Sequence, residues 1–198
     1  MMLMEIEAPR VRLGEVVEAA RGSVPPDRIP EDADYVLLEH IRAGTGQLSS
    51  ATTGESEIKS AKFAFVGGDV LYGKLRPQLR KVCVVETPGY CSMDLVPLRP
   101  VREGSAYFIA AALRGDRFFA QVERLISGAN LPRINVRDLL ELEIPWPTES
   151  ELVRLNELAR LATQLRGEAT EVLERVDALE RSIDLASHAV ARKRLSIS

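Results

Sequence analysis

The sequence predicts a mixed α/β (α+β) domain followed by one long helix. Between residues 35 and 98, short apolar segments rich in Val, Leu and Tyr are separated by Gly and Pro, which is typical of strands. After residue 98 the apolar residues recur with the longer period of a helix, and residues 149–195 carry an unbroken heptad repeat. The chain has 198 residues, of which 45% are hydrophobic and 28% charged. These values are typical of a soluble protein with one globular domain and an appendage.

The first part of the domain is predicted to consist mainly of strands. Residues 11–20 have the apolar spacing of a short helix that ends before Gly22. Residues 35–41 are expected to form a buried strand, and the Gly-, Ser- and Thr-rich residues 42–60 a long polar loop. Four further strands are expected at residues 62–66, 69–75, 81–86 and 90–98.

The second part of the domain is predicted to be helical. Two helices are expected at residues 105–113 and 116–126, with Gly115 between them. An irregular segment, a turn at residues 137–140 and a last strand at residues 142–144 follow. The segment Pro145-Trp146-Pro147 cannot continue a helix or a strand ladder, so we expect a stiff joint at which the domain ends.

The last quarter of the chain is predicted to be a coiled-coil helix. Thr148 can cap it, Glu151 can complete a capping box, and Pro147 and Leu152 can form a hydrophobic staple. At 1.5 Å per residue the helix would be ~70 Å long. Its apolar residues recur in alternating steps of three and four, at Leu155, Leu158, Ala162, Leu165, Ala169, Val172, Val176, Leu179, Ile183, Ala186 and Val190.

An apolar stripe this narrow needs a partner. The preferred interpretation is an intermolecular coiled coil, formed with a second copy of the chain or with a helix of another protein. The alternative is that the helix folds back against the domain of its own chain. Most of a ~70 Å helix would then project unpaired into water, which disfavours this alternative.

Composition also bears on location and cofactors. The sequence has no run of about 18 apolar residues that could span a bilayer, and its start lacks the features of a signal peptide. Its two cysteines and two histidines make a disulfide framework or a zinc site an unfavourable interpretation. We therefore expect a cytoplasmic protein without a metal or another cofactor of its own.

Basic residues gather in one stretch of the domain. Strand alternation would place Lys74, Arg76 and Gln78 on one face, if the chain stays extended through Pro77. Arginine and glutamine side chains can form paired hydrogen bonds to guanine and adenine edges, and lysines can bind phosphates. A solvated edge strand, kept basic to prevent aggregation, is an equally good interpretation of the residues alone. The stretch contains one acid, Asp69, and six bases: Lys59, Lys62, Lys74, Arg76, Arg80 and Lys81.

Two patterns raise the alternative of an enzyme. Residues 68–75 have the spacing of a phosphate-binding loop, but Leu75 stands where the motif needs Ser or Thr. Asp27 together with Glu57 and Lys59 has the residue types of a magnesium-dependent nuclease, in which carboxylates hold the metal and a lysine activates water. Both patterns are short enough to arise by chance, and both lie in sequence that does not predict the required framework.

Three longer motifs resemble a known family. They read GDVLYGKLRPQLRK at residues 68–81, SGANLPRIN at 127–135 and LEIPWP at 142–147, and the last leads into the heptad helix. In these residues and in their order the chain is similar to the DNA-specificity (S) subunit of type I restriction-modification systems. That subunit usually has two target-recognition domains, each followed by a long helix, and the two helices pair antiparallel as a spacer. It has no catalytic site, and the methyltransferase subunits that bind it carry S-adenosylmethionine.

The resemblance implies a half-length form of that subunit. Residues 1–147 would be one target-recognition domain for double-stranded DNA, and residues 148–198 a dimerising spacer helix. The implied partners are DNA, a second copy or another half-subunit, and methyltransferase and restriction subunits. A coiled-coil adaptor that binds protein instead of DNA is the alternative from another class. The expected DNA-binding residues, which either contact DNA or support the recognition surface, are Lys59, Lys62, Lys74, Arg76, Gln78, Arg80, Lys81, Ser127, Asn130 and Arg133.

Overall fold

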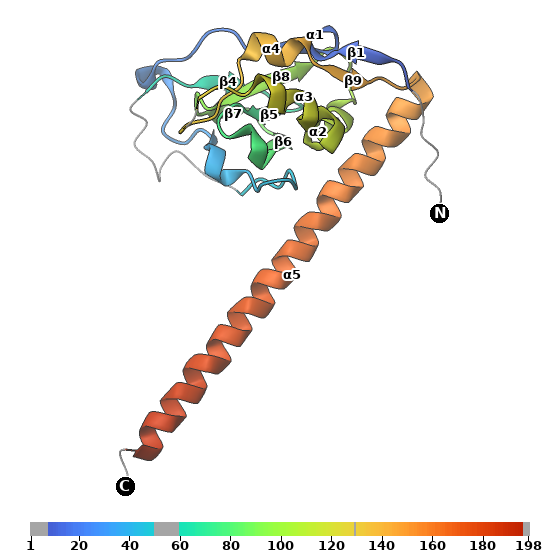
Figure 1. Ribbon diagram of the computed structural model, residues 1–198. Helices are drawn as coiled ribbons and strands as arrows, with labels where there is room; N and C mark the ends of the chain where they lie inside the picture. Colours follow the sequence, from blue (N-terminus) through green and yellow to red (C-terminus); the bar gives the residue numbers. More distant parts are fainter. Residues whose placement is uncertain (1–7, 50–59, 129, 196–198) are drawn as a thin grey trace. The chain divides into compact units, whose positions relative to one another are not determined.

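The computed structural model describes residues 8–49, 60–128 and 130–195, with side chains described up to residue 183 (Figure 1). The chain divides into two compact units, residues 1–161 and 162–198. We call the described part of the first unit the head and that of the second the distal helix. One helix, α5 (Glu149–Leu195), begins in the head and continues through the distal helix.

The head is built on a four-stranded antiparallel sheet with the strand order β2–β8–β5–β6. Its strands are β2 (Val17–Ala19), β5 (Val70–Gly73), β6 (Val82–Val84) and β8 (Leu95–Pro100). A second sheet has the order β3–β7–β4, and β1 pairs with β9 at one edge of the head. These strands are β3 (Tyr35–Val36), β4 (Phe63–Phe65), β7 (Gly89–Cys91), β1 (Arg10–Arg12) and β9 (Glu143–Pro145).

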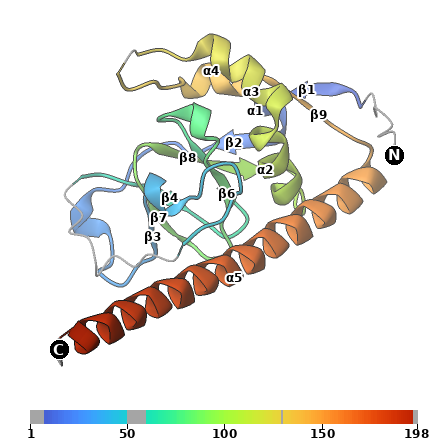
Figure 2. The same ribbon diagram turned by 60° about the horizontal axis from the view of Figure 1, so that its bottom comes forward.

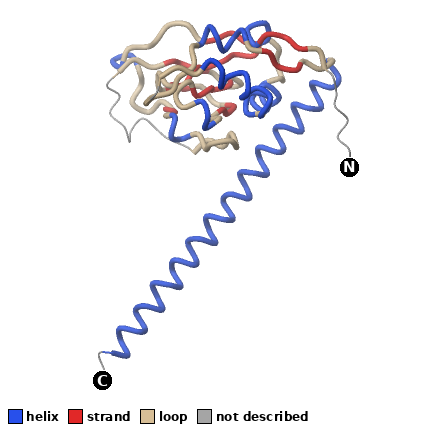
Figure 3. Tube along the Cα trace, in the orientation of Figure 1, coloured by secondary structure: helices blue, strands red, loops and turns tan. Residues whose placement is uncertain are grey.

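Short helices complete the head. Helix α2 packs against β5, β6 and β8, and α1 packs against α4 (Figure 1). Figure 3 shows the strands in red and the helices, including the continuous course of α5, in blue. The α-helices are α1 (Leu13–Val16), α2 (Ala106–Arg114), α3 (Asp116–Val122) and α4 (Val136–Glu141). The 3-10 helices are η1 (Pro26–Arg28), η2 (Leu38–His40), η4 (Pro77–Leu79) and η5 (Glu123–Leu125).

Strand β5 lies between two hydrophobic clusters. Val70 and Tyr72 belong to the larger cluster, which includes the buried face of α2, whereas Leu71 belongs to a smaller one. The side chains of β6 are shared between the clusters in the same way: Val82 belongs to the larger cluster and Cys83 to the smaller one. Side chains alternate across a strand, so a segment covered on both faces is apolar throughout. This burial explains why the strands at residues 69–86 could be predicted from the sequence.

The predicted fold class is confirmed, whereas several local predictions are wrong. Residues 11–20 are not one helix, because their backbone pairs with distant strands: β1 with β9 and β2 with β8. The expected strand at 35–41 stops after Val36 and continues as η2. The strand at 90–98 is broken between β7 and β8. The turn at 137–140 is helix α4, capped by Asn135 Oδ1, which accepts the Arg137 N–H at 2.8 Å.

Helix α5 starts at Glu149, next to the predicted joint. Glu151 Oε2 accepts the Thr148 N–H at 3.0 Å, as expected of a capping box. The Thr148 hydroxyl donates to the same carboxylate oxygen at 2.6 Å, so it does not cap the helix in the predicted way. The Phe108 N–H donates to Asn156 Oδ1 at 3.0 Å, and Leu152 is buried. The first turns of α5 are therefore part of the head, and the domain boundary at residue 147 stays a prediction.

None of the described helices combines the length and the apolar character needed to cross a membrane.

A buried carboxylate links β5 to β8. Asp69 is 1% exposed and accepts hydrogen bonds from Arg99 Nε at 2.9 Å and Arg99 Nη2 at 3.0 Å. Its Oδ2 also accepts the Val66 N–H at 2.9 Å, which closes the turn before β5. Three donors thus replace the hydrogen bonds to water that this carboxylate loses on burial.

Replacing Asp69 by Asn should therefore destabilise the head. The amide keeps the size of the side chain but loses the negative charge opposite Arg99 and presents an N–H to a donor. We expect the free energy of unfolding to fall by about 2 kcal/mol, measured by urea denaturation. Asp32, which is exposed, provides the control: Asp32→Asn should change it by less than about 0.5 kcal/mol. Equal values for the two variants would contradict this account of Asp69.

Candidate nucleic-acid interface

The basic motif forms a tight turn after β5. The strand ends at Gly73, and η4 follows from Pro77. Arg76 and Arg80, on either side of η4, have φ values of 51° and 48°, in the left-handed region. Proline disfavours the right-handed helical conformation of the residue before it, and Arg76 adopts the left-handed one. The chain is thus not extended through Pro77, and the condition for placing Lys74, Arg76 and Gln78 on one strand face is not met.

The second motif forms a narrow loop. Ser127 and Arg133 form two backbone hydrogen bonds, of 3.0 Å and 2.8 Å, and so close the described residues between them into a loop. Gly128 has a φ of 93°, which favours glycine at the first position of the loop. Leu131 is 54% exposed.

The two motifs meet through their backbones. The Arg76 N–H donates to the Pro132 carbonyl at 2.8 Å, and the Ile134 N–H donates to the Lys74 carbonyl at 3.2 Å. Leu75 and Arg133 form an antiparallel bridge between these bonds. We call residues 74–81 and 127–133 together the paired loops (Figure 2). Segments about fifty positions apart in the sequence thus form one surface feature.

The described part of the polar loop at 42–60 reaches the same place. The Gly44 N–H donates to the Leu79 carbonyl of η4 at 3.2 Å. The loop turns back on itself, with the Arg42 N–H donating to the Gln47 carbonyl at 2.9 Å. Residues 42–49 therefore lie against the paired loops, whereas residues 50–59 lie outside the described residues.

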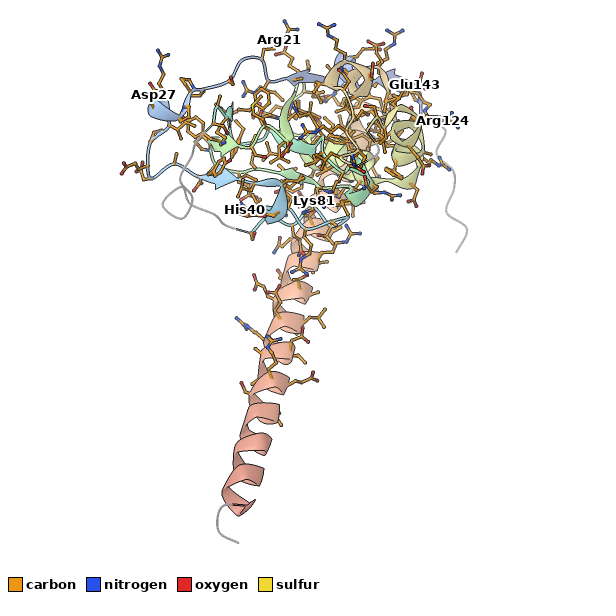
Figure 4. All side chains as sticks on the ribbon, turned by 60° about the vertical axis from the view of Figure 1, so that its left-hand side comes forward. Arg21, Asp27, His40, Lys81, Arg124 and Glu143 are labelled. Carbon is orange, nitrogen blue, oxygen red and sulfur yellow. The ribbon has the colours of Figure 1, made fainter. Side chains whose placement is uncertain are left out.

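Two of the predicted DNA-binding cations hold the turn against other elements. Arg80 pairs with Asp116 at the start of α3, and its guanidinium lies 4.6 Å from the centre of the Phe119 ring. Lys81 Nζ donates to the Leu38 carbonyl of η2 at 3.0 Å. In Figure 4, Lys81 lies near His40 of η2. These contacts explain how the left-handed conformation at Arg80 is maintained.

Two lysines are held in aromatic surroundings. Lys62 is 6% exposed; its Nζ donates to Ser60 Oγ at 2.6 Å and lies 5.4 Å from the centre of the Tyr35 ring. Lys74 Nζ lies 5.3 Å from the centre of the Phe63 ring. Burial lowers the pKa of both ammonium groups and raises the pKa of Tyr35 to about 12. Lys62 is thus placed as a packing residue, and Lys59 lies outside the described residues.

Arg76 and Gln78 differ from these cations. Both side chains are exposed, and neither has a hydrogen-bond or ionic partner among the described residues. Ser127 and Asn130 are exposed on the other loop, and Arg133 pairs with Asp94 at 2.9 Å while staying half-exposed. Arginine and amide side chains that are free to reorient are the types that read guanine and adenine in the major groove.

The structure offers little support for the nuclease alternative. Asp27 lies on η1, which Figure 4 shows well away from Lys81. Its predicted companions, Glu57 and Lys59, lie outside the described residues. Within the described part of the chain, no three His, Cys, Asp or Glu side chains come close enough together to hold a metal ion.

Arg114 is a supporting residue that sequence reasoning missed. It is 9% exposed at the end of α2, and its Nη1 donates to the Val82 carbonyl at 2.8 Å. Gly46 lies so close that a Cβ there would be 2.2 Å from Nη1. The Arg80 guanidinium also donates to the Arg114 carbonyl at 3.4 Å. In the sequence, this role is indicated by one arginine at the end of an otherwise apolar helix.

Arg80 and Arg76 should therefore differ in their effect on stability. We expect Arg80→Ala to lower the free energy of unfolding by about 1.5 kcal/mol, since it removes the ring contact, which is partly buried, and the ion pair to the exposed Asp116. Arg76→Ala should change it by less than about 0.5 kcal/mol, because the side chain is exposed. Thermal and urea unfolding of the two variants would measure the difference, and a larger loss for Arg76→Ala would contradict the assignment.

Comparison with known proteins agrees with this architecture. No protein-family model matches the chain. It is 32% identical over 154 residues, 75% of its length, to the specificity subunit of the type I restriction enzyme EcoDI of Escherichia coli. The match covers 34% of that protein. The chain thus spans about a third of the length of this curated relative.

Solved structures show the same fold. The crystal structure of the HsdS subunit from Thermoanaerobacter tengcongensis matches with a TM-score of 0.62 and 22% identity, over 87% of this chain and 48% of that one. The type I restriction-modification S subunit from M. genitalium matches with a TM-score of 0.57 and 17% identity, over 85% and 43%. The head and its long helix thus have the fold of one part of an HsdS subunit.

In sequence and in fold, the chain is thus similar to one part of the specificity subunits of type I restriction-modification systems.

Proposed function

We propose that this chain recognises a specific sequence in double-stranded DNA as a half-subunit of a type I restriction-modification complex. The observation that carries the proposal is the backbone pairing of the two motif loops, which presents Arg76 and Gln78 at one exposed site. The sequence similarity to a type I specificity subunit supports the same function.

Recognition would combine base and phosphate contacts. Arg76 can form two hydrogen bonds to guanine, and Gln78 can form two to adenine. Arg133 and Lys74 lie beside them and would bind phosphates, which position the protein without reading sequence. Arg80, Lys81 and Lys62 would act indirectly, through the conformation of the turn and the packing beneath it. The neighbouring residues 42–49 would contribute further contacts.

The chain would have no catalytic role of its own. Methyl transfer would belong to methyltransferase subunits that bind the chain and carry S-adenosylmethionine, and cleavage to restriction subunits. The complex would work in the cytoplasm. In this scheme the chain selects the DNA site and brings the other subunits to it.

The long helix would supply the second recognition unit. Its stripe is largely exposed: Leu165, Val172, Leu179 and Ile183 are 57–66% exposed. Ala186 and Val190 lie beyond the described side chains, so their place in the stripe stays a prediction. Pairing of such stripes would join two heads into one DNA-binding molecule.

Charge reversal at Arg76 should weaken DNA binding without unfolding the head. A site would first be selected from random duplexes with the purified protein. We expect Arg76→Glu to reduce affinity for that site by roughly 100-fold, because it removes a base contact and adds repulsion. Gln78→Ala should cost roughly tenfold and relax the choice of base at one position. Fluorescence anisotropy across a salt series would measure both effects.

The control is Arg28→Glu on η1, an exposed arginine away from the paired loops. It carries the same change in net charge and should reduce affinity by less than about threefold. Equal losses for Arg28→Glu and Arg76→Glu would count against the paired loops as the reading site. A purified protein that binds no duplex at low salt but captures a protein partner would favour the adaptor function instead.

A further inference from the structure

Leu131 is an apolar side chain that the second motif loop leaves in solvent. It is 54% exposed, whereas Ile134, three residues on, is 3% exposed and belongs to the main hydrophobic cluster. Figure 2 shows the loop, in yellow, projecting beyond α4. Single exposed leucines are common on protein surfaces, so exposure alone assigns Leu131 no role. Its position in the paired loops, beside the proposed DNA contacts, distinguishes it from the others.

The backbone around Leu131 is held on both sides. On one side, Gly128 lies so close that a Cβ added there would be 2.9 Å from the Leu131 carbonyl oxygen. On the other side, the Pro132 carbonyl accepts the Arg76 N–H at 2.8 Å. Proline also disfavours the right-handed helical conformation of the residue before it. Leu131 therefore meets a ligand on a preformed loop, which limits the conformational entropy that binding removes.

The neighbours of Leu131 are polar and exposed. Asn130 precedes it, and Arg133 follows after one proline. The first motif places Arg76 against the same proline through a backbone hydrogen bond. Arg133 also pairs with Asp94 at 2.9 Å, which ties the end of the loop to the segment before β8. An apolar side chain thus lies among groups suited to base edges and phosphates.

We propose that Leu131 reads thymine in the DNA site, through contact with the C5 methyl group in the major groove. The inference rests on the proposed function, and it adds a residue that selects one base. Thymine alone presents a methyl group in the major groove, where the other groups of the bases are hydrogen-bond donors and acceptors. A leucine side chain has no donor or acceptor, so the methyl group is the one that it can contact without loss.

The same chemistry rejects cytosine. Cytosine presents an N4 amino group in the major groove and has no methyl group at C5. Leucine beside that amino group would displace water without accepting a hydrogen bond, which is unfavourable. Contact with thymine instead removes apolar surface of both partners from water. Leu131 would therefore distinguish the two pyrimidines, whereas Arg76 and Gln78 would recognise purines.

A supporting role for Leu131 in the loop makes a different prediction. A leucine that held the loop in place would be buried against it, and replacing it would destabilise the head. Leu131→Ala should instead leave the midpoint of urea unfolding unchanged, as expected of an exposed side chain. The two backbone hydrogen bonds between Ser127 and Arg133 close the loop without the leucine side chain.

Removal of one methyl group from the DNA tests the contact. In the duplex selected from random sequences, each thymine would be replaced in turn by uracil, which lacks only the C5 methyl group. At one position of the half-site, the wild-type chain should lose roughly fivefold in affinity, the value of about one buried methyl group. Leu131→Ala should bind the thymine duplex roughly fivefold less tightly. The uracil replacement should then cost this variant less than about 1.5-fold, since the two changes remove the same contact.

Gln78→Ala and Val101→Ala are the controls. Gln78 would contact a different base, so Gln78→Ala should keep the uracil penalty of the wild type although its overall affinity falls. Val101 is 62% exposed and follows β8 at the end of the sheet away from the paired loops. Val101→Ala should change neither the affinity nor the penalty. Methylation at C5 of a cytosine placed at the same position should raise affinity roughly fivefold in the wild type and not in Leu131→Ala.

The outcomes separate the inference from the proposed function. Equal uracil penalties in the wild type and in Leu131→Ala would overturn the reading of thymine and leave DNA recognition intact. A selected site without thymine would do the same. A lower unfolding midpoint for Leu131→Ala, with no change in the uracil penalty, would assign the side chain to the support of the loop instead. A folded chain that binds no duplex at low salt would contradict the proposed function itself.

Discussion

The head depends on a small sheet whose two faces are both covered. Strands β5 and β6 send alternate side chains into two separate clusters, and α2 closes one of them. Burial on both faces fixes the register of these strands, because a slip of one residue would exchange the two sets of side chains. The turn between β5 and β6 therefore starts and ends at defined positions. The basic residues of that turn take their places from this register.

The turn itself contains two strained residues. Arg76 and Arg80 are left-handed without being glycine, a conformation that costs about 1 kcal/mol or more for each. Pairing with the second loop holds Arg76 by its backbone, and contacts with α3 hold Arg80 by its side chain. A strained residue held by its backbone alone leaves its side chain free, and Arg76 is the residue so placed. The structure thus separates the residues that shape the turn from those available to a ligand.

The sequence predicted the parts of this arrangement that depend on local pattern. The strands around Val70 and Val82 and the long helix α5 have clear periods in the sequence, and the structure confirms these strands and this helix. The segment of α1 and the flanking β1 and β2 was predicted wrongly because its partners lie some eighty and more positions away, beyond any local pattern. The sequence identified the basic motif, but it did not show which of its residues hold the turn and which stay exposed. Arg80 holds the turn through Asp116 and Phe119, which no local spacing in the sequence connects to it.

The exposed stripe of the distal helix is the remaining physical constraint. A single helix in water is only marginally stable from its own hydrogen bonds, and most helices in proteins depend on tertiary packing. Leu165, Val172 and Leu179 would each contribute roughly 1.5 to 3 kcal/mol if fully buried. A stripe with that much unused apolar surface favours association over exposure.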